Sequence, residues 1–159
     1  MKKLFLFIFT IITFVQFGYS QKTYIPDDNF EAYLEANGMG DGINNNDSVT
    51  TANISGITNL SVSNQNISDL TGLGAFTSLT GLNCGGNPQL TYLDVSQNYS
   101  LVSISSRSSG LINVNFGTIS NIKSLDLLNN QITSLDLTSL TQLEGTYFRN
   151  NQLTSLDVS

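Results

Sequence analysis

The sequence has no histidine and no tryptophan, and its single cysteine is Cys84. Without histidine the chain cannot build Ser-His-Asp or Cys-His nucleophilic sites, and it lacks the imidazole ligands of the usual zinc sites. One cysteine cannot form a disulfide within the chain, so the fold has to be stable without one. These absences remove common catalytic and metal-binding classes, and we predict no catalytic residue, no metal site and no cofactor.

Basic residues are also scarce, and two of the six are Lys2 and Lys3. They precede the apolar run LFLFIFTIITFV, after which Gly18 and Ser20 provide the small residues that stand before a signal-peptidase site. We therefore predict a signal peptide over 1–20. The apolar run is too short for a comfortable membrane span. No segment after residue 20 is apolar enough to span a membrane, so none is expected to do so after cleavage.

Removing that segment leaves four basic residues against twelve acidic ones, a net charge of −8. A chain of this charge repels phosphate backbones, which argues against a nucleic-acid partner. The predicted signal peptide, in turn, indicates a protein that is secreted or displayed at the cell surface.

The dominant pattern is the phrase L-x-x-L-x-L, which occurs twice within IKSLDLLNNQITSLDLTSL (122–140). Its middle apolar position recurs every 10 to 12 residues, and two intervals make a unit of 21 or 22 residues. These positions are Leu60, Leu70, Leu82, Leu93, Ile104, Val114, Leu125, Leu135, Thr146 and Leu156. Helices do not repeat at this spacing, so the pattern indicates a repeat architecture built from short strands.

The last two apolar positions of the phrase lie two residues apart, so both side chains point to one face of a strand. Small polar residues follow and turn the chain. One coil cannot bury its apolar row alone, whereas stacked coils bury it and pair their strands in parallel. We predict a mainly β solenoid: a nearly straight, right-handed coil with parallel strands on both faces and a short N-terminal capping helix.

One half of each unit ends in a residue at a fixed place, which is Asn87, Ser109, Asn130 or Asn151. An inward asparagine can bond the bending backbone with both its carbonyl and its amide, and stacked copies would form a ladder. Because serine is shorter, we expect the Ser109 rung to be weaker.

The other half reads L-D-V or L-D-L, with Asp94, Asp136 and Asp157 at one outward register. Ile119 or Leu140 stands there in the place of the asparagine.

The segments LTGLNCGGNPQL (79–90) and IKSLDLLNNQI (122–132) resemble the leucine-rich repeat family, whose core phrase is L-x-x-L-x-L-x-x-N. The first unit (57–79) is similar to the 22-residue repeat of internalins, with Gln65 in the asparagine position. Later units resemble a nested 21-residue bacterial class, in which a second L-x-x-L-x-L replaces the convex helix. The resemblance covers 57–159 and implies a solenoid of about five units. The sequence stops inside the last unit, and we interpret it as truncated or as a fragment of a longer protein.

Residues 21–56 break the period, and we predict that they cap the solenoid. The stretch PDDNFEAYLEANG predicts a short helix, with Asp28 and Glu31 at capping-box spacing. Phe30 and Leu34 share one face of that helix, which would cover the open end of the first coil.

On the asparagine half, the outward residues differ between coils while the core repeats. Arginine and tyrosine are residue types that anchor protein interfaces. We predict a partner-binding face composed of Arg107, Asp126, Leu128, Tyr147 and Arg149. Ordinary surface variation is the alternative.

The loop GMGDGINNNDS offers Asp41, Asn44, Asn46 and Asp47 as oxygen ligands for calcium. It does not match EF-hand spacing and lacks the closing glutamate, so a turn-forming loop explains it better. Cys84 stands at an inward position and is interpreted as a small core residue.

The aspartate row could also serve an inverting glycosidase, because carboxylates two coils apart would lie roughly 10 Å from each other. Such an enzyme needs a cleft and an acid with a raised pKa, which a surface row does not offer. Aspartates bonded to solvent or to backbone are favoured.

The leading hypothesis is a non-catalytic, secreted or cell-surface leucine-rich repeat protein that binds a protein or another cell-surface macromolecule through its strand face. Adhesion or host contact is what the resemblance implies. The alternative is a carbohydrate-binding or polysaccharide-acting β-solenoid, for which outward aromatics are few: Tyr92, Tyr99 and Tyr147. The third hypothesis is a structural spacer for a domain that is missing from this sequence.

Overall fold

The computed structural model describes residues 20–158. The predicted signal peptide therefore lies, except for Ser20, outside the described residues. Between residues 20 and 158, no helix combines the length and the apolar character that crossing a bilayer requires.

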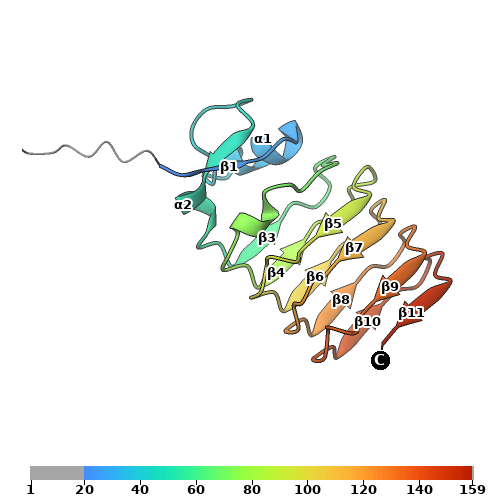
Figure 1. The fold of residues 1–159 in the computed structure, drawn as a ribbon. Helices are drawn as coiled ribbons and strands as arrows, with labels where there is room; N and C mark the ends of the chain where they lie inside the picture. Colours follow the sequence, from blue (N-terminus) through green and yellow to red (C-terminus); the bar gives the residue numbers. More distant parts are fainter. Residues whose placement is uncertain (1–19, 159) are drawn as a thin grey trace, which may run out of the picture.

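Strands of three residues each wind into a solenoid (Figure 1). They are β3 (Asn59–Ser61), β4 (Gly81–Asn83), β5 (Tyr92–Asp94), β6 (Ser103–Ser105), β7 (Asn113–Asn115), β8 (Ser124–Asp126), β9 (Ser134–Asp136), β10 (Gly145–Tyr147) and β11 (Ser155–Asp157). Strands β3, β4, β6, β8 and β10 form one parallel sheet, which with the turns after its strands is called the asparagine side. On the other side, the aspartate side, β5 pairs with β7 and β9 pairs with β11, again in parallel. The two-sided coil is the predicted fold class, and Figure 1 shows its coils stacked without a pronounced bend.

The repeat sets the register between coils. Leu82 pairs with Ile104, which pairs with Leu125, and on the aspartate side Leu93 pairs with Val114. All of these side chains are buried, so the inward row predicted from the phrase forms one continuous core. Burial decreases in the last coil, where Leu156 is 48% exposed and Val158 is 71% exposed.

The first coil departs from the pattern on the aspartate side. Leu70 is buried as predicted but lies in no strand, and it is followed by a 3-10 turn, η1 (Leu73–Ala75). Among the described residues, β5 therefore has no strand beside it on the N-terminal side.

The N-terminal segment folds against the first coil. It comprises β1 (Lys22–Tyr24), α1 (Asp28–Ala36), β2 (Ser48–Thr50) and α2 (Thr51–Ile54), and β1 pairs antiparallel with β2. The predicted helix is confirmed, and its Phe30 and Leu34 are fully buried. The Phe30 ring stacks on Phe76 of the first coil with centroids 6.3 Å apart. The sequence did not indicate β1, β2 or α2.

The residue that caps α1 is Asp27, and the capping box expected from Asp28 and Glu31 is wrong. One Asp27 carboxylate oxygen accepts from two N–H groups at the start of the helix. The other oxygen accepts from the backbone N–H groups of Ser68 and Asp69 and from the Ser68 hydroxyl. Burial would raise the pKa of Asp27, but these hydrogen bonds lower it below its usual value. One side chain thus joins the capping helix to the first coil.

The asparagine ladder forms as predicted. The Asn87 carbonyl accepts from the backbone N–H groups of Gln65 and Ile67, and its amide donates to the carbonyls of Val62 and Cys84. Each rung therefore bonds its own coil and the coil before it. The Gln65 side chain, expected in the asparagine position, is exposed and donates to the carbonyl of Ser63 in its own coil.

Asn130 and Asn151 repeat this arrangement in later coils. Asn130 accepts from Leu111 N–H and donates to the carbonyls of Ser106 and Leu127. Ser109 donates to one carbonyl, that of Cys84, at 3.2 Å. The rung at Ser109 is therefore the weaker one, as predicted.

A further rung on the aspartate side escaped the sequence analysis. Asn98 is fully buried, and its amide donates to the carbonyls of Leu73 and Phe76. Its own carbonyl oxygen is buried without a hydrogen-bond partner among the described residues. The backbone N–H groups of Ala75 and Phe76 in the preceding coil do not bond this oxygen. They donate to the carbonyls of Gly72 and Leu73 within the 3-10 turn.

Candidate binding surface

The outward face of the five-stranded sheet is a shallow groove of about 430 Å³. Its floor consists of two columns of mostly small polar residues. One column is Asn59, Gly81, Ser103, Ser124 and Gly145; the other is Ser61, Asn83, Ser105, Asp126 and Tyr147. The first column was not singled out from the sequence, although it is the register position before each central apolar residue.

Two of the five predicted face residues bond to each other. Nε and Nη2 of Arg107 donate to one Asp126 oxygen at 3.1 and 2.6 Å. The other Asp126 oxygen accepts from the Leu128 backbone N–H. The structure thus brings Arg107, Asp126 and Leu128 together across two neighbouring coils.

Tyr147 and Arg149 lie one coil further along. Tyr147 is 58% exposed at the end of the groove, and Arg149 is exposed on the turn that follows. No acidic side chain between residues 20 and 158 forms an ion pair with Arg149. Because the Arg149 carbonyl accepts from Asn129 N–H and the Leu128 carbonyl accepts from Ser108 N–H, the backbone holds these turns one above the other. The five residues together are called the arginine–tyrosine face.

An exposed polar row borders this face. Ser108, Asn129 and Asn150 all have left-handed backbone angles, with φ between 56° and 59°. The Asn150 amide donates to the Asn129 carbonyl at 2.6 Å, and the Asn129 amide donates to the Ser108 hydroxyl at 3.2 Å. Asparagine tolerates this conformation better than most residues, which explains the doubled asparagine of the LNN and RNN turns.

The aspartate row stabilises turns. Asp94 accepts from Ser96 N–H, and Asp136 accepts from Thr138 N–H. Hydrogen bonds from the Thr138 side chain and backbone lower the pKa of Asp136. Burial would raise the pKa of Asp94, but hydrogen bonds that include those from Ser96 lower it. Both carboxyls are therefore ionised where a glycosidase acid must be protonated, which disfavours that mechanism.

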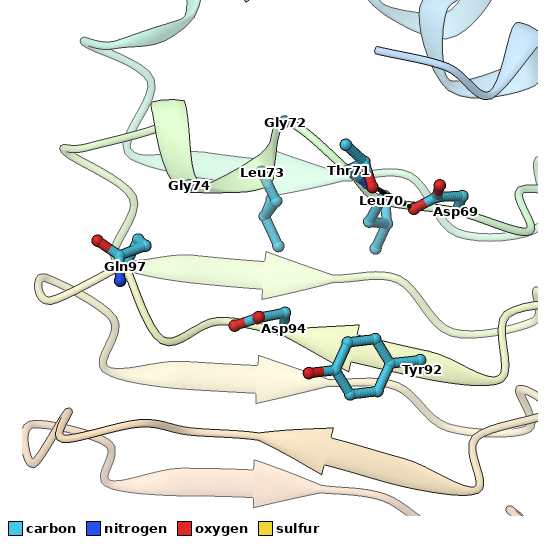
Figure 2. A pocket seen from close by; sticks show the side chains of 9 residues that line it. All are labelled: Asp69, Leu70, Thr71, Gly72, Leu73, Gly74, Tyr92, Asp94 and Gln97. Carbon is cyan, nitrogen blue, oxygen red and sulfur yellow. Dashed lines mark hydrogen bonds between the residues drawn. The ribbon is translucent and has the colours of Figure 1, made fainter. Parts of the chain in front are cut away.

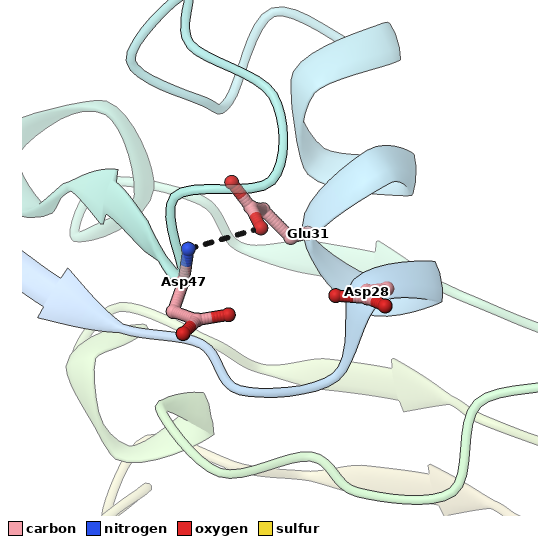
Figure 3. A group of neighbouring side chains, drawn as sticks. All are labelled: Asp28, Glu31 and Asp47. Atoms are coloured by element: carbon pink, nitrogen blue, oxygen red, sulfur yellow. Dashed lines mark hydrogen bonds between the residues drawn. The ribbon is translucent and has the colours of Figure 1, made fainter.

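The 38–48 loop is organised as a turn. Asp41 pairs with Lys22 and also accepts from the Asn46 amide, and its pKa falls to about 2, chiefly because of Lys22. Figure 3 shows a different acidic group at this end of the molecule, formed by Asp28, Glu31 and Asp47.

Glu31 is 1% exposed and accepts from the backbone N–H groups of Asn46 and Asp47. This carboxylate therefore fixes the loop against α1.

Cys84 is fully buried, and burial raises the pKa of its thiol to about 11. It is a core residue, as predicted, since a protonated and enclosed thiol is a poor nucleophile.

A second hollow, of about 280 Å³, lies beside β5 on the aspartate side (Figure 2). It is lined by the polar residues Asp69, Thr71, Tyr92, Asp94 and Gln97 and by the turn that contains η1. We call it the Tyr92 pocket.

Comparison with models of known protein families finds no match, and neither does comparison with curated proteins. Among solved structures, the functional domain of InlJ from Listeria monocytogenes, which includes a cysteine ladder, is similar with a TM-score of 0.66 and 25% identity. The match covers 88% of this chain and 31% of that chain, so this chain spans about a third of the InlJ functional domain. Internalin C2 from Listeria monocytogenes str. 4b F2365 is similar with a TM-score of 0.54 and 22% identity, covering 87% of this chain and 78% of that chain.

The fold is therefore the leucine-rich repeat solenoid of the internalins, as the repeat phrase predicted. The cysteine ladder of InlJ has no counterpart here, because the whole sequence contains one cysteine.

Proposed function

We propose that this chain is the binding domain of a secreted or cell-surface bacterial protein, that it acts without catalysis, and that it binds a protein partner through the arginine–tyrosine face. The observation that carries the proposal is the contrast between a repeating core and a non-repeating outer face on the same strands. Leu125 repeats Leu82, whereas Tyr147 stands where the equivalent residue of β4 is Asn83.

The residue types of the face suit a protein interface. Tyr147 offers a large ring with a polar tip, and Arg149 offers a planar group with five donors. The Arg107–Asp126 ion pair keeps a third charged group in a defined position beside them. Because the strands are fixed by backbone bonds to both neighbouring coils, binding would cost little ordering of the backbone.

The charge of the face also points to a kind of partner. Two of the four basic residues after position 20 belong to it, although that part of the chain carries a net charge of −8. An acidic or carboxylate-bearing segment of the partner would contact Arg149 and would be repelled elsewhere on the surface.

The proposal can be tested by measuring binding of the fluorescently labelled domain to cultured epithelial cells. We expect saturable binding that mild trypsin treatment of the cells abolishes, because the partner is a protein. Replacing Tyr147→Ala and Arg149→Ala together should weaken binding at least about tenfold, since such side chains dominate interface energies.

A matched double variant, Tyr99→Ala with Lys123→Ala, serves as control. It removes one exposed tyrosine and one exposed cation outside the face and should bind as the parent does. Equal binding by the face variant, or binding that survives trypsin treatment of the cells, would refute the proposal.

A further inference from the structure

The Tyr92 pocket exists because the first coil lacks a strand on the aspartate side. In later coils a strand pairs with its neighbour there, but in the first coil the chain forms η1 instead. Gly72 has φ +97°, and a Cβ on it would lie 2.4 Å from the Ile25 side chain, so the turn must remain bare to pack on the capping segment. Gly74 approaches the next coil less closely, because its Cβ would lie 3.1 Å from the Gln97 side chain. Both glycines line the pocket beside Thr71 and Leu73, and they add no side chain to it.

The side chains that do line the pocket form a consistent chemical set (Figure 2). Tyr92 is 50% exposed and presents a ring next to Asp94 on the same outward face of β5. Asp69 and Gln97 project from the turns at the two ends of the pocket. A ring beside several hydrogen-bond acceptors matches a ligand that has an apolar face and a rim of hydroxyl donors.

From this geometry we propose that the Tyr92 pocket binds a neutral hexopyranose unit, whose C–H face packs on Tyr92 and whose hydroxyls donate to Asp94 and Asp69. The aromatic ring supplies apolar contact with a defined orientation. Hydroxyl donors bonded to carboxylates form charge-assisted hydrogen bonds, which are stronger than those between neutral groups. The cavity of about 280 Å³ accommodates one sugar ring.

The charge of the lining selects among sugars. The lining of the pocket contains two carboxylates, those of Asp69 and Asp94, and it contains no basic residue. A uronic acid or another anionic sugar would place a third negative charge among them and would be repelled. The site is independent of the arginine–tyrosine face, because it lies on the other side of the solenoid.

The test is a titration of the 15N-labelled domain with methyl β-D-glucopyranoside and methyl β-D-galactopyranoside, followed by amide chemical shifts. At least one glycoside should shift the amides of Thr71, Tyr92 and Gln97 in a saturable way, with a dissociation constant in the millimolar range. Sodium glucuronate at the same concentration and ionic strength should shift them at least about tenfold less.

Three variants separate the pocket from general surface effects. Tyr92→Ala should weaken binding about tenfold, whereas Tyr99→Ala should leave it unchanged because Tyr99 is exposed away from the pocket. Asp94→Asn removes the charge, and the turn should persist because Asn115 already makes the equivalent bond to Gly117 N–H in the next coil. This variant should bind the glycosides more weakly and discriminate less against glucuronate, because Asp69 alone keeps its negative charge.

The outcomes that would overturn the inference are definite. They are the absence of saturable shifts at the pocket with both glycosides, equal affinity of the Tyr92→Ala and parent domains, or equal loss in Tyr99→Ala. Far-ultraviolet circular dichroism and thermal midpoints of each variant establish that the fold is retained before binding is compared.

Discussion

The two sides of the solenoid achieve their turns by different means. On the asparagine side, side chains such as Asn87 and Asn130 bond the backbone of their own coil and of the coil before. On the aspartate side, Asp94 and Asp136 accept from N–H groups two residues ahead, and Asp94 also accepts from the Asn115 amide of the next coil. The first side carries one continuous sheet of five strands, whereas the second carries two separate pairs.

Inter-coil asparagine rungs accompany the continuous sheet on the asparagine side, whereas β5 and β7 of the aspartate side pair although Ile119 stands in the rung position. β7 and β9 lie in successive coils of the aspartate side but belong to different sheets. In the first coil of this side the Asn98 rung bonds to η1 and its C-cap in place of a strand, and the pocket opens there.

The largest effect is expected at a complete rung. Asn130→Leu should lower the free energy of unfolding by about 3 kcal/mol, because the Leu111 N–H and the Ser106 and Leu127 carbonyls lose their buried partner. Urea denaturation measures this change. Asn129→Gly is the matched control: it removes the neighbouring exposed asparagine at a φ of 58° that glycine adopts readily, and it should cost less than about 1 kcal/mol. If both variants were equally stable, inter-coil rungs would not explain the difference between the sides.

A smaller loss of stability is expected on replacing Asp27, whose carboxylate bonds the N-terminal cap to the first coil. Its pKa is lower in the folded state than in the unfolded state, so it stabilises the fold above the usual carboxyl range. That contribution should be lost as the pH falls below about 4 and through the folded pKa. Asp27→Asn should cost about 2 kcal/mol at pH 7, because the amide group would face N–H donors, and progressively less in acid.

Urea denaturation of both proteins between pH 2 and pH 7 measures the loss at Asp27. Asp28→Asn, at the adjacent exposed position, removes the same charge and should not reproduce the pH-dependent difference. A constant gap between the Asp27→Asn and parent proteins across this range would show that the ionised carboxylate is not what joins the cap to the coil.

The smallest effect should be a gain. Ser109→Asn completes the weaker rung of the third coil and should raise the free energy of unfolding by about 1 kcal/mol. Thermal and urea unfolding of the variant would register the gain. Ser108→Asn, at the exposed neighbouring position, controls for composition and should change stability by less than half as much. A destabilised Ser109→Asn protein would mean that this coil is already closed too tightly to admit an amide.

The repeating part of this architecture was predictable because its cause is local. A spacing of two between apolar residues fixes which side chains face inward, and the same place in each unit identified Asn87 and Asn130. The Asn98 rung could have been found by the same counting, because it stands five residues after Leu93 as Asn87 stands five after Leu82. The aliphatic residues Ile119 and Leu140 at that place concealed it.

Other features depend on contacts that no short stretch encodes. The role of Asp27 required knowledge that the turn at Ser68 lies beside the start of α1, 41 residues later in the chain. The Tyr92 pocket results from the lack of a strand in one coil and from the close packing of Gly72 on Ile25. The ion pair of Arg107 with Asp126, by contrast, follows once the columns are stacked, since the two residues lie in neighbouring columns of successive coils.

The enclosed Cys84 gives this protein an internal reporter. Its thiol is fully buried where its own coil packs beside Ser106 of the next coil, and no other thiol exists in the sequence to compete for a reagent. A thiol-reactive dye should therefore label the native chain only as fast as those two coils separate. The labelling rate would time how often the N-terminal end of the stack opens, without any engineered probe.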